Sequence, residues 1–209
     1  MPKLRVHNLT VTQDGFATGP GQRLEAPFGD FPENLHAWMF AAMRDLADGK
    51  AGIDVDYIAR SEENIGATIM GRNMFGPVRG PWQDESWKGW WGDNPPYHND
   101  VFVHTHHPRP SLTMEGGTRF HFTDQPIETV RDLAFEAAGG KDVRIGGGPG
   151  TVQQYLRAGL VDELHMAVAP VLAGRGERLL DHLGDAVSHY RVAEQVTSDT
   201  VTHVVLLRR

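Results

Sequence analysis

Short apolar runs alternate with segments in which apolar residues recur every three or four positions. The short runs predict strands at residues 4–11, 65–70, 101–105, 120–123, 143–145 and 164–168. The helical spacing predicts one helix that starts at Pro32 and runs past Leu46, a second over 127–137 and a third over 151–158. Residues 49–56 break the first helical pattern. Strands that alternate with helices favour a parallel sheet with helices on both faces.

The end of the chain has a different pattern. Residues 190–196 and 201–207 predict two strands joined by a polar turn at 197–200, so we expect an antiparallel hairpin at one edge of the sheet. Residues 18–30 and 76–100 predict long loops. At 209 residues, the chain is best interpreted as one domain over 1–209 of the α/β class.

Three consecutive glycines, Gly146, Gly147 and Gly148, separate the predicted strand at 143–145 from a helix with Pro149 in its first turn. Glycines let the backbone approach a ligand closely, and the start of a helix favours an anion such as phosphate. The segment therefore indicates a nucleotide site, although a strand-to-helix turn without a ligand has the same pattern. Neither the dinucleotide fingerprint nor the P-loop fits, because Thr151 stands where a last glycine belongs and no Gly-Lys-Ser/Thr occurs.

Two other turns follow predicted strands, Asp14-Gly15 and Gly71-Arg72. Ligands of such sheets bind beyond the carboxyl ends of the strands, so both turns are expected beside the glycine segment. The Arg72 guanidinium suits a phosphate, and its alternative is a solvated residue at a helix start. Asp14 is the candidate catalytic residue, to orient a substrate or relay a proton, and its alternative is an ordinary Asp-Gly turn. Glu33 and His36 are weaker relay candidates.

Polar residues end the predicted strand at 101–105. Thr105 and His106 are candidates to hydrogen-bond a phosphate or ribose. Two alternatives remain open here: His104 and His106 hold a metal with His98 or His107, or they are surface histidines. No acidic partner or metalloprotease pattern stands nearby, so the prediction is no metal.

Four of the five tryptophans fall in the predicted loop 76–100. Three readings of this loop stay open. In the first, the rings form a wall of the ligand pocket or stack on a flat heterocycle; in the second they pack over the edge of the sheet; in the third they bury a subunit interface. The tryptophans are Trp82, Trp87, Trp90 and Trp91.

Charge and composition narrow the function. The net charge of −7 argues against a nucleic-acid surface. No cysteine is present, which excludes disulfides and thiolate metal sites. No apolar stretch is long enough to cross a bilayer, and charges within residues 1–11 do not fit a signal peptide. A cytoplasmic protein with no membrane partner is expected.

In their order along the chain, these segments resemble the dihydrofolate-reductase-like superfamily. The resemblance is to the branch of the riboflavin-biosynthesis deaminase-reductase C-terminal (reductase) domain and its stand-alone relatives. The matching segments are 14–16, 67–72, 101–107, 143–156 and 160–174. The resemblance departs at Met74, where dihydrofolate reductases carry a hydroxyl residue. It implies a three-layer α/β/α fold with a central, mainly parallel mixed sheet and an antiparallel C-terminal hairpin.

The resemblance also implies an NADPH-dependent reductase that transfers hydride to a small heterocyclic substrate, similar to 5-amino-6-(5-phosphoribosylamino)uracil reductase, and often a homodimer. Alternatives are dihydrofolate reduction and a non-catalytic nucleotide- or flavin-binding protein. Arg23, Arg79 or Lys88 would serve a phosphoribosyl group. For the cofactor, the family implies contacts to the 2′-phosphate side from Arg72, Thr105 and His106, and to the nicotinamide and phosphates from Gly71, Gly146, Gly147, Gly148 and Thr151.

Overall fold

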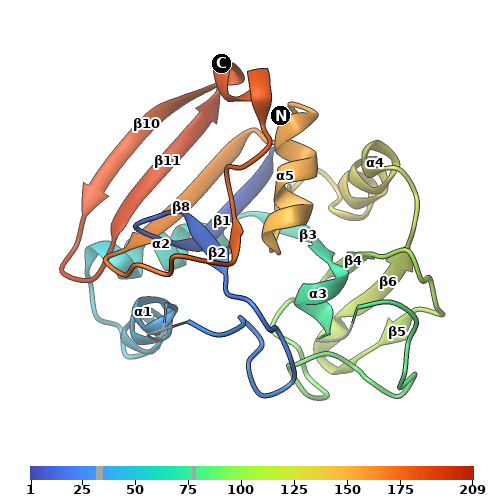
Figure 1. Ribbon diagram of the computed structural model, residues 1–209. Helices are drawn as coiled ribbons and strands as arrows, with labels where there is room; N and C mark the ends of the chain where they lie inside the picture. Colours follow the sequence, from blue (N-terminus) through green and yellow to red (C-terminus); the bar gives the residue numbers. More distant parts are fainter. Residues whose placement is uncertain (32–34, 77–78) are drawn as a thin grey trace.

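A nine-stranded, mostly parallel sheet forms the centre of the molecule in a computed structural model that describes residues 1–31, 35–76 and 79–209 (Figure 1). The strand order is β10-β11-β8-β1-β7-β3-β4-β6-β5. In that order the strands are Tyr190–Thr197, Thr202–Arg208, Glu163–Ala169, Leu4–Thr12, Asp142–Ile145, Ile65–Gly71, Asp100–His104, Arg119–Thr123 and Leu112–Thr113. The pairs from β8 to β6 are parallel, and β11, β10 and β5 add antiparallel edges. A two-stranded sheet joins β2 (Phe16–Thr18) to β9 (Glu177–Arg178).

Helices cover both faces of this sheet. On one face, α4 (Ile127–Ala137) and α5 (Pro149–Arg157) bury Val130, Ala134, Val152 and Leu156 against the central strands. On the other face, α1 (Ala37–Ala47) and α2 (Ile53–Glu62) pack on β8 around Trp38. Apolar residues on both sides of the strands are expected when layers cover both faces. The predicted α/β/α architecture with its C-terminal hairpin is therefore confirmed.

The tryptophan loop extends the second face over β3, β4 and β6. Trp82, Trp87 and Trp91 pack against a cluster that contains Phe75 and Phe120. Trp82 lies edge-on to Phe75, with ring centroids 5.9 Å apart. Of the three readings of this loop, packing over the sheet is the one confirmed for these three rings.

A chain of buried hydrogen bonds runs beneath α2. The Asn8 N–H donates to Nδ1 of His165 over 3.1 Å, Nε2 of His165 lies 3.0 Å from Nδ1 of His203, and Nε2 of His203 lies 2.9 Å from Asp54. His165 and His203 have no exposed surface, and Tyr57 stacks on both rings. One placement of hydrogens satisfies every bond: both rings are neutral with the proton on Nε2.

Two expectations near the first helix were wrong. The helix begins at Ala37 rather than at Pro32, which lies outside the described residues, and residues 35–36 form a turn. Residues 53–56, interpreted as a break, open α2, which the sequence pattern did not predict. No described helix is both long enough and apolar enough to span a membrane.

Candidate active site

The carboxyl ends of β1, β7, β3 and β4 meet at one edge of the sheet, because these four strands are neighbours and parallel. The turn after β3 is Gly71 followed by the short helix α3 (Arg72–Phe75), and the turn after β7 is the glycine run that leads into α5. Thr105 follows His104, whose β4 position pairs with Gly71. The structure therefore brings together the segments that sequence analysis placed in the cofactor site.

Gly71 lies against both Gly147 and Thr151. The Gly71 N–H donates to the Gly147 carbonyl over 2.7 Å. A Cβ on Gly71 would lie 2.2 Å from Oγ1 of Thr151, so only glycine fits there with Thr151 in place. Gly147 has a φ of 128°, a conformation that favours glycine. The peptide bond between Gly147 and Gly148 is cis.

Next to this contact, the start of α5 leaves open space. A Cβ built on Gly148 or Gly150 would meet no atom within 4 Å. Gly146, in contrast, lies under Met74, whose methyl carbon would be 2.9 Å from such a Cβ. Gly71 and Gly146 are thus closely packed, whereas the backbone at Gly148 and Gly150 is accessible. An accessible backbone at the N-terminus of a helix fits a diphosphate.

Arg72 lies against the face of Trp82, with Cζ 3.4 Å from the ring centroid. Its Nε and Nη1 atoms are buried without a hydrogen-bond partner, and no carboxylate of the described residues forms an ion pair with it. Burial, together with the positive charge of Arg109, lowers the pKa of Arg72 to about 10. The guanidinium therefore remains charged at neutral pH.

Thr105 and His106 lie at the start of the loop after β4. Thr105 is buried, and its hydroxyl accepts from the His107 N–H over 3.1 Å. His106 is exposed. Nε2 of His104 lies 2.9 Å from the Gln125 carbonyl, and Nδ1 of His98 lies 2.8 Å from the Gly116 carbonyl. Within residues 1–31, 35–76 and 79–209, no group of three or more potential metal ligands is gathered.

Asp14 follows β1 at the same edge, but its carboxylate is already engaged. It accepts hydrogen bonds from the Thr12 hydroxyl over 2.6 Å and from the N–H groups of Ala173 and Gly174 over 3.1 and 2.8 Å. The Thr12 hydroxyl, followed by the Ala173 N–H, lowers the pKa of Asp14 to about 2. An ionised carboxylate at neutral pH is suited to holding the loop after β8 and to orienting a ligand, more than to donating a proton.

The two weaker candidates for a proton relay are Glu33 and His36. Glu33 lies outside the described residues. His36 precedes α1 and is buried, with its ring stacked on Phe28 at a centroid distance of 3.9 Å. Burial lowers the pKa of His36 to about 4, so this ring is neutral at pH 7.

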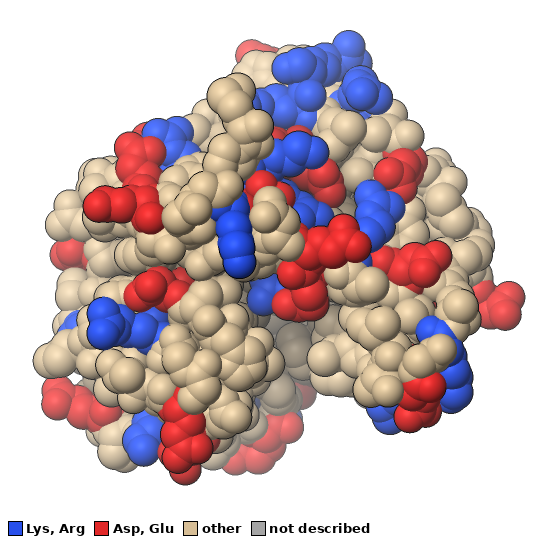
Figure 2. All heavy atoms as spheres, turned by 180° about the vertical axis from the view of Figure 1, so that it is seen from behind, with Lys and Arg blue, Asp and Glu red and all other residues tan. Residues whose placement is uncertain are grey.

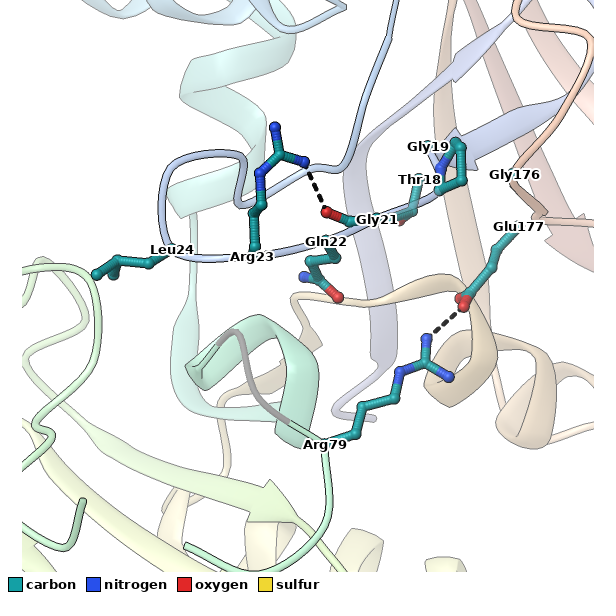
Figure 3. A pocket seen from close by; sticks show the side chains of 10 residues that line it. Thr18, Gly19, Gly21, Gln22, Arg23, Leu24, Arg79, Gly176 and Glu177 are labelled. Atoms are coloured by element: carbon teal, nitrogen blue, oxygen red, sulfur yellow. Dashed lines mark hydrogen bonds and ion pairs between the residues drawn. The ribbon is translucent and has the colours of Figure 1, made fainter. Parts of the chain in front are cut away.

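A cavity of about 680 Å³ lies beside α3 (Figure 3). Its wall comes from residues 18–24, Arg79 and the segment at Gly176 and Glu177. Arg79 pairs with Glu177, and Gln22 donates to the carbonyl of Asn73 in α3 over 3.0 Å. None of the residues predicted for the cofactor lines it, whereas Arg23 and Arg79, named for a phosphoribosyl group, both do. The third basic candidate, Lys88, is exposed in the tryptophan loop and pairs with Asp93.

The sequence pattern did not single out Arg109 or its contact with Trp82. Arg109 lies on the Trp82 ring at 4.0 Å from its centroid and donates to the carbonyls of Glu85 and Trp87. The sequence places Arg109 shortly after the tryptophan-rich loop, and this proximity was a signal for the contact. The contact between Arg109 and Trp82 itself depends on the path of that loop. On the face seen in Figure 2, acidic and basic side chains are intermixed.

The fold, together with the turns that meet at one edge of the sheet, defines an α/β protein of the dihydrofolate-reductase-like class. The RibD C-terminal domain family matches residues 4–204, so the chain belongs to that family, which is a family of reductases.

Solved structures of low sequence identity to this chain share its fold. A pyrimidine reductase-like protein from Corynebacterium diphtheriae is 17% identical, with a TM-score of 0.56, and the match covers 100% of this chain and 92% of that one. Dihydrofolate reductase from Enterococcus faecalis, complexed with NADP(H), is 15% identical with a TM-score of 0.53, covering 99% and 96%.

A longer protein also matches. The diaminohydroxyphosphoribosylaminopyrimidine deaminase/5-amino-6-(5-phosphoribosylamino)uracil reductase from Thermotoga maritima is 14% identical with a TM-score of 0.59. The match covers 100% of this chain, which spans 57% of that protein. Among curated proteins, none matches.

Proposed function

We propose that this chain is an NADPH-dependent reductase that transfers hydride to a C=N or C=O carbon of a small heterocyclic substrate. The substrate we propose resembles 5-amino-6-(5-phosphoribosylamino)uracil. The observation that carries the proposal is the packing of Gly71 against Gly147 and Thr151 at the carboxyl ends of β3 and β7, in a chain of a reductase family. NADPH would supply the hydride, and the chain would bind and orient both reactants.

The residues at this edge fit the cofactor. The orphaned nitrogens and unpaired charge of Arg72 suit the 2′-phosphate, with Thr105 and His106 in the adjoining loop. The open backbone at Gly148 and the start of α5 suit the diphosphate, with Thr151 beside a phosphate. Gly146 and Gly147 would border the nicotinamide. Gly71 leaves room for Thr151.

The cavity beside α3 is the proposed substrate site. Its volume of about 680 Å³ is in the range of small-molecule pockets. Arg79 and Arg23 are paired with Glu177 and Asp30, and either pair would reorganise around an anionic substrate group. Asp14 would orient the substrate or the loop beside it through its ionised carboxylate. Bound water is the proposed proton source.

The test is NADPH oxidation with a panel of ribosylaminopyrimidines and dihydrofolate, in wild type and Arg72→Ala. We expect turnover with a pyrimidine and a loss of NADPH affinity of about tenfold to a hundredfold in the variant, because a charge-assisted contact is removed. Arg131→Ala is the control and should leave affinity unchanged, because Arg131 lies in α4 and pairs with its neighbour Asp132.

Three results would contradict parts of this proposal. Turnover of dihydrofolate alone would assign the activity of the E. faecalis neighbour. Tight NADPH binding with no turnover of any substrate would indicate a nucleotide-binding protein without chemistry. Unchanged NADPH affinity in Arg72→Ala would refute the placement of the 2′-phosphate.

We also propose that the protein is cytoplasmic and forms a homodimer. The support is the family resemblance. Static light scattering would then give twice the chain mass of 23.1 kDa, and a mass of one chain would contradict the dimer.

A further inference from the structure

Trp82 is held between two positive charges. Cζ of Arg72 lies 3.4 Å and Cζ of Arg109 lies 4.0 Å from its ring centroid. Two guanidinium groups this close to one centroid do not fit on the same face, so they lie on opposite faces. The indole N–H donates to the His107 carbonyl over 2.7 Å, which fixes the plane of the ring.

The two arginines differ in their partners. Arg109 donates to the carbonyls of Glu85 and Trp87, so it holds the tryptophan loop. Arg72 has no such bonds: its Nε and Nη1 atoms are buried and unpartnered. Neither arginine has an ion-pair partner among the described residues. Asp84 and Glu85 act electrostatically on Arg109 without forming an ion pair with it, whereas the charge of Arg72 has no carboxylate beside it, so the field at Arg72 favours an anion.

We propose that Trp82 is a positioning residue for the cofactor and that the stack of Arg72, Trp82 and Arg109 sets the preference for NADPH over NADH. This inference rests on the proposed function. Trp82 fixes the plane of the Arg72 guanidinium, and its edge donors are then aligned for the 2′-phosphate. Arg109 packs on the opposite face of the ring and is itself held by the carbonyls of Glu85 and Trp87, so it keeps Trp82 in place under Arg72.

Stacking explains why a tryptophan serves here. A guanidinium lies flat on an aromatic ring and keeps its hydrogen-bond donors in the plane, where they are available to a phosphate. An arginine that is already ordered loses less freedom when its ligand binds. The tryptophan loop thus has a role at the site through the ring at position 82, while Trp87 and Trp91 pack on the sheet.

The experiment is calorimetric titration of the whole chain with NADP⁺ and with NAD⁺, which differ only in the 2′-phosphate. It compares wild type, Trp82→Leu, Trp82→Phe and Trp90→Leu. Trp90 is the matched control, because it belongs to the same loop and its ring contacts Trp87. Thermal unfolding and circular dichroism check that each variant is folded, and Trp82→Phe keeps an aromatic face if Trp82→Leu does not fold.

We expect Trp82→Leu to lose about tenfold in NADP⁺ affinity with little change for NAD⁺. Trp82→Phe should lie between it and wild type, and Trp90→Leu should match wild type. A purely structural role for Trp82 would weaken both dinucleotides equally, and that result would overturn the inference.

The failures of the two proposals are distinguishable. If wild type binds neither dinucleotide, the proposed function fails and the inference fails with it. If wild type prefers NADP⁺ and the folded Trp82 variants keep that preference, only the inference is overturned. Equal binding of NADP⁺ and NAD⁺ by wild type would also overturn it, while a reductase that uses either cofactor would stand.

Discussion

Gly71 and Thr151 show at the residue scale how closely the two halves of the site are packed. They are 80 positions apart in the sequence, yet the Thr151 hydroxyl occupies the place where a Cβ on residue 71 would stand. The hydrogen bond from Gly71 to Gly147 joins the same two turns. A single added methyl group would therefore disturb β3, the glycine run and α5 together.

Gly71→Ala should lower both stability and cofactor binding. We expect a loss of about 1–3 kcal/mol in the free energy of unfolding, as for other overpacked sites, and a rise of at least about tenfold in the Kd for NADPH. Urea unfolding and calorimetry measure the two effects. The cause is the clash at 2.2 Å, so the double variant with Thr151→Ala should recover part of the stability.

Gly150→Ala is the matched control, because a Cβ there meets no atom within 4 Å. Alanine is also the better helix former, so this variant should be at least as stable as wild type. If Gly71→Ala were as stable as Gly150→Ala, the described packing of Gly71 against Thr151 would be wrong.

Asp14 illustrates how a sequence signal can point to a position without fixing its role. The Asp-Gly pair predicts a turn, and that turn is confirmed, with Gly15 at a φ of 90°. The three donors to the carboxylate come from Thr12, Ala173 and Gly174, and two of them lie about 160 residues away. No local pattern predicts such partners, so the role of Asp14 in orienting a ligand stays a prediction.

At the element scale, α2 is the helix that sequence analysis missed. Its buried residues include Ser61 and Tyr57, and its first turn carries Asp54 and Asp56, so the apolar spacing is poor. Acidic residues favour a helix start through the helix dipole, but after two glycines they also fit a turn. The buried face of α2 is mixed: Val55 and Ile58 join an apolar cluster, and Tyr57 packs on histidines from β8 and β11.

That histidine pair predicts acid sensitivity. Protonating His165 or His203 would place two donors face to face, because each ring nitrogen already has a committed role. Burial lowers the pKa of both rings, that of His165 to about 2. The unfolded chain binds these protons near pH 6.5 and the folded chain does not. The free energy of unfolding should thus be constant above about pH 7 and fall below about pH 6.5.

Urea unfolding at pH 8, 6.5 and 5 measures this effect. Each histidine that takes up its proton only on unfolding contributes about 1.4 kcal/mol per pH unit below about pH 6. His165→Gln should show a shallower slope than wild type, while the control His106→Gln, at an exposed position, should not. A wild-type stability that is the same at pH 8 and pH 5 would contradict the neutral pair.

The neighbouring carboxylates do not account for the expected fall in the free energy of unfolding between pH 8 and pH 5. The pKa of Asp54, Glu163 and Glu194 is lowered, so these groups contribute stability that is lost only under more acidic conditions. The other charged or titratable groups near the histidines are His7 and Arg5 on β1 and Tyr57 and Arg60 on α2.

At the scale of the whole molecule, the sheet and the edge at which these turns meet were predictable, because both depend on glycine-containing turns that directly follow apolar strands. Gly71-Arg72 and the glycine run each end a buried apolar strand, and parallel strands bring such ends together. The stack on Trp82 and the histidine chain were not predictable. They depend on which strands are neighbours and on the path of a long loop, and the order β11-β8-β1 is not the order in sequence.

The proposed function requires that the carboxyl edge of β7, β3 and β4 binds NADP(H). A crystal structure of the chain with NADP⁺ tests it most directly. We expect the 2′-phosphate within hydrogen-bond distance of Arg72 and the diphosphate against Gly148 at the start of α5. A dinucleotide found at the opposite edge of the sheet, or with its 2′-phosphate away from Arg72, would contradict it.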